Sequence, residues 1–201
     1  PISVVNANAE LLSREIGENI WLANIQWENN RMGLLVEQLL DLARTETITP
    51  QMEQIDFSRL VCGEALPFES ITFEKGFVLR CHITEGISLT GNSTQLKQLV
   101  SILLDNALEH STGQEDISVV LEKEHQWAKL SVINAGKEIP LPQREQLFER
   151  FYRMDSARSG EDKHYGLGLA IAKSIATTHK GRIHVLCYDG LVEFQVLLPL
   201  Q

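Results

Sequence analysis

The chain has 201 residues, of which 43% are hydrophobic and 22% are charged, as in ordinary globular proteins. Its formal net charge of -9 argues against a nucleic-acid-binding surface, because phosphate backbones are bound by basic patches. The sequence shows neither a bilayer-length apolar run nor a signal peptide, so we expect a cytoplasmic protein. Its cysteines are widely spaced, and we expect buried, reduced thiols without a metal at Cys62, Cys81 and Cys187.

Residues 1–46 predict a helical hairpin. They contain no proline after Pro1, and Gly17 and Gly33 are their only glycines. Apolar residues recur at helical and heptad spacing on both sides of Gly17: Val5, Ala9, Leu12, Ile16, Trp21, Ile25, Met32, Leu35, Leu39 and Leu42. The apolar stripe is wider than a two-helix seam, so we expect a second copy to complete a four-helix bundle. Packing of the stripe on the rest of the chain is the alternative.

Residues 47–55 are expected to form a linker, and residues 56–201 a second domain that interleaves helices and strands. Helices are predicted at 58–73, 93–109, 142–151 and 166–178, with Pro67 as a candidate kink. Strands are predicted at 77–84, 117–122, 127–133, 182–187 and 192–198. Asp189-Gly190 predicts a tight turn between the last two strands. Consecutive strand pairs favour the α+β class, with a mixed sheet and helices on one face.

Two short segments carry the clearest chemical signal. Gly166-Leu167-Gly168-Leu169 is a glycine turn that runs into an amphipathic helix, whose first N–H groups can face phosphates. Residues 103–107 place Asn106 in an apolar helical run, where its amide needs a polar partner such as a nucleotide phosphate with its metal. A helix start without a ligand, and an amide satisfied by a neighbouring carbonyl, are the alternatives. No Gly-x-x-x-x-Gly-Lys-Ser/Thr motif is present, which excludes a P-loop.

Four segments in a fixed order resemble the N, G1, F and G2 boxes of sensor histidine kinases: residues 103–107, 132–136, 147–153 and 166–169. The hairpin is similar to the dimerisation and phosphoacceptor domain of that family. The resemblance covers essentially the whole chain. It implies a dimerisation hairpin followed by a Bergerat-type α/β sandwich, which together form the transmitter region of a bacterial, ATP-dependent protein histidine kinase.

The resemblance also implies roles for individual residues. Asn106 would hold Mg²⁺, and Asn134, which stands where the family usually has Asp, would accept a hydrogen bond from the adenine amino group. Gly136 would let the backbone approach the base, and residues 154–165 would form a lid over ATP. Further residues expected to bind the nucleotide are His110, Tyr152, Arg153, Gly166, Leu167, Gly168 and Leu169. Capping of a helix end is an alternative role for His110.

The family's phosphoacceptor histidine lies shortly before the proline that corresponds to Pro1, so the acceptor would fall outside this chain. The phosphoryl group would then pass to an aspartate on the receiver domain of a response regulator. We expect the chain to be the cytoplasmic portion of a membrane-anchored sensor, attached to the membrane only through segments outside this chain.

Several residues depart from the family pattern. Ile102 replaces a second Asn, and Glu109 stands where a Lys often contacts phosphate. Lys137 and Glu138 occupy the end of the second box, which usually carries another Gly. These departures support an alternative, a degenerate module that only dimerises and docks a partner. An ATPase of the gyrase or mismatch-repair kind shares the boxes but leaves the hairpin unexplained.

Overall fold

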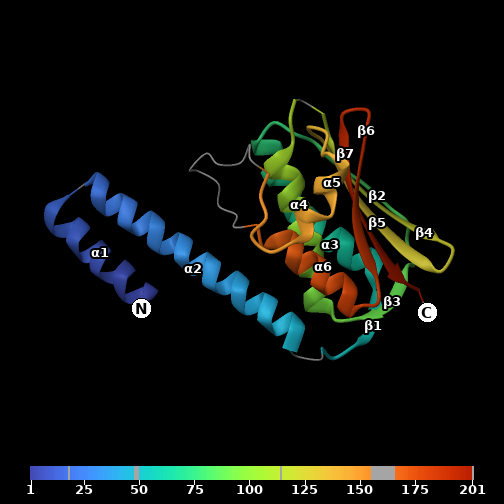
Figure 1. Cartoon of the computed structure of the whole chain (residues 1–201), viewed down its shortest axis with the longest axis horizontal. Coiled ribbons are helices and arrows are strands. Elements are labelled where there is room, and N and C mark those ends of the chain that lie inside the picture. The colour runs from blue at the N-terminus through green and yellow to red at the C-terminus, as the bar shows by residue number, and fades with distance from the viewer. Residues whose placement is uncertain (18, 48–49, 114, 155–165, 201) are drawn as a thin grey trace.

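The computed structural model describes residues 1–201 except 18, 48–49, 114, 155–165 and 201, and the side chains of 37–38, 41–42 and 44–47 are also outside the description. Helices α1 (Ile2–Ile16) and α2 (Ile20–Thr47) form an arm that projects from a layered α/β unit (Figure 1). The helices of that unit are α3 (Phe57–Glu74), α4 (Ser93–His110), α5 (Leu141–Arg144), the 3₁₀ helix η1 (Gln146–Phe148) and α6 (Gly168–Thr178). Its strands are β1 (Glu53–Asp56), β2 (Leu79–Ile83), β3 (Ser88–Gly91), β4 (Ile117–Glu124), β5 (Trp127–Ala135), β6 (Arg182–Tyr188) and β7 (Leu191–Pro199).

The predicted hairpin is confirmed, and its first helix ends at the predicted break. Gly17 has a φ of 74°, and its N–H donates to the carbonyl of Ser13. Three asparagines tie the two helices together, because Asn29 donates to Asn6 Oδ1 and to the carbonyl of Ile2, each at 2.7 Å. Asn6 in turn donates to Asn30 Oδ1 at 2.8 Å. These amide contacts fix the antiparallel register of α1 against α2.

Few apolar side chains of the hairpin are covered within a single chain. Among its described residues only Ala9, Leu22 and Asn29 are buried. Exposed apolar side chains run along both helices: Val4, Val5, Leu11, Leu12, Ile16, Ile20, Trp21, Ile25, Trp27, Met32, Leu34, Val36, Leu39 and Leu40. Helix α2 also contacts α6, so the second region touches the arm but leaves this apolar surface exposed. The side chain of Leu42 lies outside the described residues.

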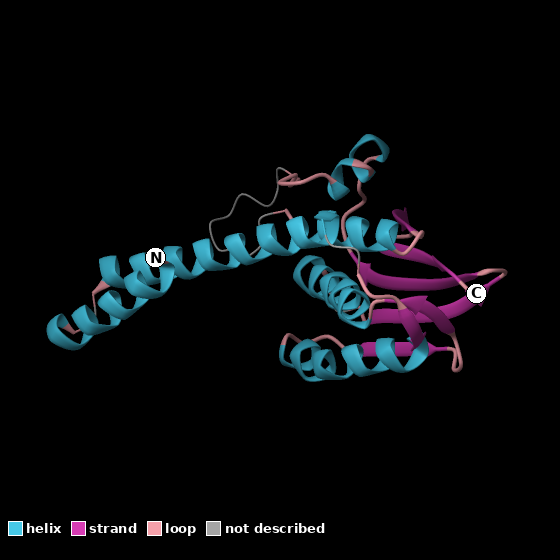
Figure 2. Ribbon diagram, turned by 90° about the horizontal axis from the view of Figure 1, so that it is seen from below, coloured by secondary structure: helices cyan, strands magenta, loops and turns pink. Residues whose placement is uncertain are grey.

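The main sheet has the strand order β2-β4-β5-β7-β6. Strands β2 and β4 are parallel and every other neighbouring pair is antiparallel, which confirms the predicted mixed sheet. Figure 2 shows α3, α4 and α6 on one face of it, as predicted. Strands β6 and β7 meet at Asp189 (φ 49°) and Gly190 (φ 78°), which is the left-handed pair that a tight hairpin turn requires.

Four local expectations were wrong. Residues 53–55, which were assigned to the linker, belong to β1, which pairs with the unpredicted strand β3. The helix expected at 142–151 is divided into α5 and η1, and the final helix begins at Gly168 rather than Gly166. Cys62 and Cys81 are exposed and Cys187 is half-buried, because they lie on the outer side of α3, on the edge strand β2 and on the edge strand β6.

The core lies between the sheet and the three helices that cover it. Helix α4 contributes most of its length, with Leu96, Leu99, Leu103, Leu104 and Ala107 all at most 1% exposed. The side chain of Asn92 begins this helix by accepting from the N–H of Gln95, as a helix cap does. Burial of this apolar face fixes the rotation of α4 about its own axis. The polar face of the helix must therefore point in one direction.

A buried histidine joins the start of α4 to the end of α6. His179 Nε2 accepts from the N–H of Asn92 at 2.9 Å, and therefore Nδ1 carries the proton and donates to the carbonyl of Ile175 at 2.8 Å. The fit is close, because a Cβ on Gly91 would lie 2.9 Å from the imidazole. Burial lowers the pKa of His179, and its hydrogen bond to Ile175 opposes that shift.

This depressed pKa predicts a loss of stability in acid. The folded protein accommodates the neutral imidazole. The contribution of His179 to the free energy of unfolding is therefore complete above the unfolded-state pKa of about 6.5, and it falls as the pH drops below that value. We expect His179→Gln to lower the free energy of unfolding by about 1–3 kcal/mol at pH 7.5, and by less at pH 5. Urea unfolding at both pH values measures this difference. The exposed strand residue His82 supplies the control, His82→Gln, and an equal effect of His179→Gln at the two pH values would contradict the assignment.

Candidate functional site

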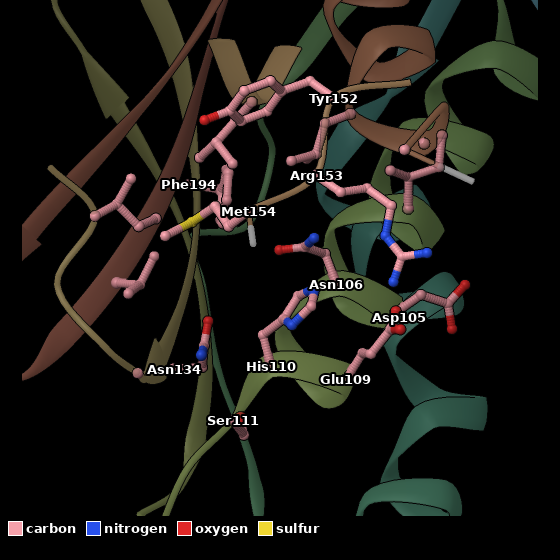
Figure 3. Close-up of a pocket in the computed structure, with 18 of the residues that line it drawn as sticks. Asp105, Asn106, Glu109, His110, Ser111, Asn134, Tyr152, Arg153, Met154 and Phe194 are labelled. Atoms are coloured by element: carbon pink, nitrogen blue, oxygen red, sulfur yellow. The ribbon is translucent and has the colours of Figure 1, made fainter. Parts of the chain in front are cut away.

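A cavity of about 520 Å³ opens beside α4, bounded by the ends of β5 and β7, the segment after η1 and the first turn of α6 (Figure 3). It brings together all but one of the residues expected to bind a nucleotide: Asn106, His110, Asn134, Gly136, Tyr152, Arg153, Gly166, Gly168 and Leu169. These residues come from four separated parts of the sequence. Their convergence in one cavity makes it the candidate functional site.

Leu167 is the exception among the expected residues. Its side chain is fully buried in the core and does not line the cavity. Leu167 instead precedes α6, where its carbonyl accepts from the N–H of Ile171. The expected lid falls largely outside the described residues: Met154 lines the cavity, and 155–165 are not described.

Helix α4 presents a polar edge to the cavity. Asn106 and His110 are separated by one helical turn, and Asp105 and Glu109 are their neighbours on the same side. The buried face of α4 determines this arrangement, because the apolar residues around Asn106 are those packed into the core. Figure 3 shows the Asn106 amide pointing into the cavity, with the His110 ring beside it.

Asn134 reaches the cavity from the end of β5 and is only 2% exposed. Its Nδ2 donates to the carbonyl of Ala135 at 2.9 Å. The same carbonyl accepts from the N–H of Thr112, which links the segment after α4 to this strand. Because the Asn134 amide nitrogen is already engaged, its Oδ1 is the atom offered to a ligand, and Figure 3 shows this oxygen directed into the cavity.

Two glycines of the site are required by close packing. A Cβ on Gly136 would lie 3.0 Å from Val192 Cγ2 and 3.4 Å from Asn134 Nδ2. Gly166 has a φ of 71°, and a Cβ there would lie 2.6 Å from the Tyr152 carbonyl oxygen. The Gly166 carbonyl also accepts from the N–H of Phe151. Gly166 therefore holds the segment that carries Tyr152 and Arg153 against the start of α6.

The first turn of α6 is a second polar element of the cavity wall. The N-cap residue Leu167 makes no side-chain hydrogen bond to this helix, and Gly168 and Leu169 line the cavity. The N–H groups of a first helical turn have no partner within the helix, and the helix dipole adds partial positive charge at this end. An 11-residue helix that begins at a cavity in this way suits an anionic group such as a phosphate.

Most of the apolar wall of the cavity was not expected from the sequence. Val192 and Phe194 line the cavity together with Ile139, Leu147 and Met154, of which Met154 was expected as part of the lid. Phe194 is fixed by an edge-to-face contact with Phe148, at a centroid distance of 6.3 Å and an interplanar angle of 84°. The alternation along β7 could have shown that Val192 and Phe194 share a face, but not that this face reaches a cavity.

Charges of both signs gather at one end of the cavity. Figure 3 shows the Arg153 guanidinium directed toward the carboxylates of Asp105 and Glu109. Lys137 also lines the cavity, whereas Glu138 is exposed outside its wall, with its carboxylate 4.0 Å from Arg144. The cavity thus has an apolar part with one amide acceptor and a polar part with oxygen ligands, cations and a helix start. This donor set fits a planar base at one end and metal-bound phosphates at the other.

Comparison with known families and curated proteins gives an independent result. The family described as Histidine kinase-, DNA gyrase B-, and HSP90-like ATPase matches residues 91–201, which contain all the described residues of the cavity wall. Sensor protein DltS of Streptococcus agalactiae is 32% identical over 205 residues, which cover 100% of this chain and 51% of DltS. Sensor protein CutS of Streptomyces coelicolor is 36% identical over 164 residues, which cover 81% of this chain and 39% of CutS. The chain spans about half or less of the length of these relatives.

Solved structures share the fold. Histidine kinase AdeS of Acinetobacter baumannii has a TM-score of 0.73 at 20% identity, with coverage of 100% of this chain and 95% of AdeS. Full-length ShkA in complex with AMPPNP has a TM-score of 0.81 at 19% identity, with coverage of 99% of this chain and 43% of ShkA. These likenesses confirm the predicted α+β fold.

Proposed function

The chain belongs to the family of histidine kinase-, DNA gyrase B- and HSP90-like ATPases, and we propose that it binds Mg²⁺-ATP as the transmitter region of a bacterial sensor histidine kinase. One observation carries the proposal: a single cavity unites the Asn134 acceptor, the Asn106 amide and the uncapped start of α6. An adenine, a metal ion and a phosphate chain each have a complementary group there.

The residues of this chain would act mainly by positioning. Asn134 Oδ1 would accept from the adenine amino group while Val192, Phe194 and Met154 enclose the ring. The first turn of α6 and Arg153 would hold phosphate oxygens. Asn106 would bind Mg²⁺, which supplies charge neutralisation for phosphoryl transfer when present. In this arrangement the γ-phosphoryl end is held in place for attack by an external nucleophile.

The nucleophile we propose is a histidine outside the 201 residues of this chain. Its imidazole nitrogen would attack the γ-phosphorus, and the bond to the β–γ bridging oxygen would break, releasing ADP. An aspartate on a response regulator receiver domain would then take the phosphoryl group from the histidine. The share of the relatives that this chain spans leaves room for such a sensor architecture, with membrane segments elsewhere in the protein. None of the described helices combines the length and apolarity that a membrane crossing needs.

The non-catalytic docking module is the weaker alternative. Its support came from Ile102, Glu109, Lys137 and Glu138, yet a cavity with an oriented acceptor and a free helix start is still formed around them. Ile102 packs against the start of α6, where a Cβ on Gly168 would lie 3.5 Å from its Cγ2. Glu138 lies outside the cavity wall. A module that only docked a partner would have no need of these features.

Base recognition by Asn134 gives the test of nucleotide binding. Because Asn134 Nδ2 is engaged by Ala135, the side chain cannot turn its donor toward the guanine carbonyl without losing that bond. We expect the wild type to prefer ATP over GTP in the presence of Mg²⁺, and Asn134→Asp to keep or increase that preference. Asn134→Leu should lose it, with a cost to ATP binding of about 1–3 kcal/mol.

Competition of ATP and GTP against a fluorescent ATP analogue measures both preferences. Gln195→Leu is the matched control, because it removes an amide from β7 that faces His184 rather than the cavity. An unchanged preference for ATP in Asn134→Leu would show that Asn134 does not read the base. A wild type without affinity for any nucleotide would favour the docking module.

We further propose that the hairpin forms a homodimer. The exposed apolar side chains of α1 and α2 cover a surface too large to leave in water, and a second hairpin of the same shape would bury it in a four-helix bundle. Leu39, on α2, is 37% exposed in the single chain. Its neighbours on that surface, Leu40 and Val36, are more exposed still.

Leu39→Glu tests this interface. The change would place an unpaired carboxylate among apolar side chains of the bundle, at a cost of several kcal/mol to association. Sedimentation velocity should show a dimeric wild type and a monomeric variant that still binds ATP, because the cavity lies in the other region. Asn24→Glu, an exposed polar position on the same helix, should remain dimeric. A wild type that is monomeric at about 100 μM would rule out the dimer for this chain.

A further inference from the structure

Glu109 occupies a position in the cavity that the proposed function does not yet explain. It lies one helical turn beyond Asn106 on α4, and both side chains line the same cavity. Glu109 stands where the family often has a Lys that contacts phosphate, and a carboxylate at this position would repel a bare triphosphate unless it were turned away. Figure 3 shows the Glu109 side chain on the cavity side of the helix, so it has not turned away from the site.

One helical turn before Asn106, by contrast, this edge offers no metal ligand. Ile102 lies one turn before Asn106, has no ligand atom, and lines the cavity next to Gly168. A metal held at Asn106 therefore has a hydrocarbon on one side along the helix and a carboxylate on the other. Mg²⁺ in nucleotide sites is commonly held by one or two carboxylates together with the phosphates.

We propose that Glu109 is the second protein ligand of the nucleotide-bound metal, with Asn106 as the first. The inference rests on the proposed function, because the metal would arrive with ATP. Under this assignment the Glu109 carboxylate weakens binding of the bare triphosphate but strengthens binding of its metal complex. Simple repulsion would weaken binding of both. Nucleotide binding by this chain is then strongly dependent on Mg²⁺.

The charges around Glu109 agree with this assignment. Arg153 is directed toward both Glu109 and Asp105, so the carboxylates already face a cation across this end of the cavity. A divalent ion with a triphosphate brings both a cation for Glu109 and anionic oxygens for Arg153.

The test compares ATP affinity with excess Mg²⁺ and with EDTA, by displacement of a fluorescent ATP analogue. The ratio of the two affinities is the readout. In Glu109→Gln we expect this ratio to fall at least about tenfold, with weaker Mg²⁺-ATP binding and equal or tighter binding of metal-free ATP. A Mg²⁺ titration at fixed ATP should also need a higher concentration of the ion to saturate. Circular dichroism checks that the variant folds.

Glu138→Gln is the matched control, since it removes the same charge from a carboxylate outside the cavity wall and should leave the ratio unchanged. Tighter Mg²⁺-ATP binding in Glu109→Gln would show that Glu109 only repels the nucleotide, and an unchanged ratio would show that it does not touch the metal. Either result overturns the Glu109 assignment while the proposed function stands. A wild type that binds no nucleotide under any condition overturns both.

Discussion

The rotation of α4 about its own axis is the constraint on which the site depends. Leu99, Leu103 and Ala107 are fully buried, and a shift of one residue would turn the helix by about 100° and expose them. The burial of these side chains thus directs Asn106 and Glu109 into the cavity. His179 holds the beginning of α4 to the end of α6, and the Ala135 carbonyl holds the segment after α4 to β5. The polar edge of α4 is thus fixed by hydrogen bonds to other elements at both of its ends.

Helix α6 links the two regions of the chain. Its first turn lines the end of the cavity where we propose that phosphates bind, and its body packs against α2 of the hairpin. A movement of the hairpin relative to the layered unit has to break or slide this α2–α6 contact. In a kinase whose acceptor histidine belongs to the hairpin, such a movement would be needed to bring the acceptor to the nucleotide. Helix α6 is therefore the element through which nucleotide binding and the position of the hairpin would be coupled.

The features that the sequence predicted well are those determined by local pattern. The periodic leucines of α4, the Asp189-Gly190 turn and the break at Gly17 each specify their own structure, and all three were confirmed. The strands β1 and β3 were not predicted, because a strand of four residues is too short to show a recognisable alternation of apolar and polar residues. These two strands are formed by pairing with each other. Leu167 was assigned to the site because it lies within the glycine motif, yet the turn at Gly166 directs its side chain into the core. Val192 and Phe194 became cavity residues only through the tertiary arrangement of distant segments.

Hydrogen exchange of the backbone amides, with and without Mg²⁺-AMPPNP, tests the central claim most directly. The account predicts slower exchange at the first turn of α6 and at residues 134–136 when nucleotide and metal are both present. The amides of α1, which lie far from the cavity, provide the internal reference and should be unchanged. Exchange that is unaltered at the α6 turn, or slowed only in the hairpin, would contradict the assignment of the cavity as the nucleotide site.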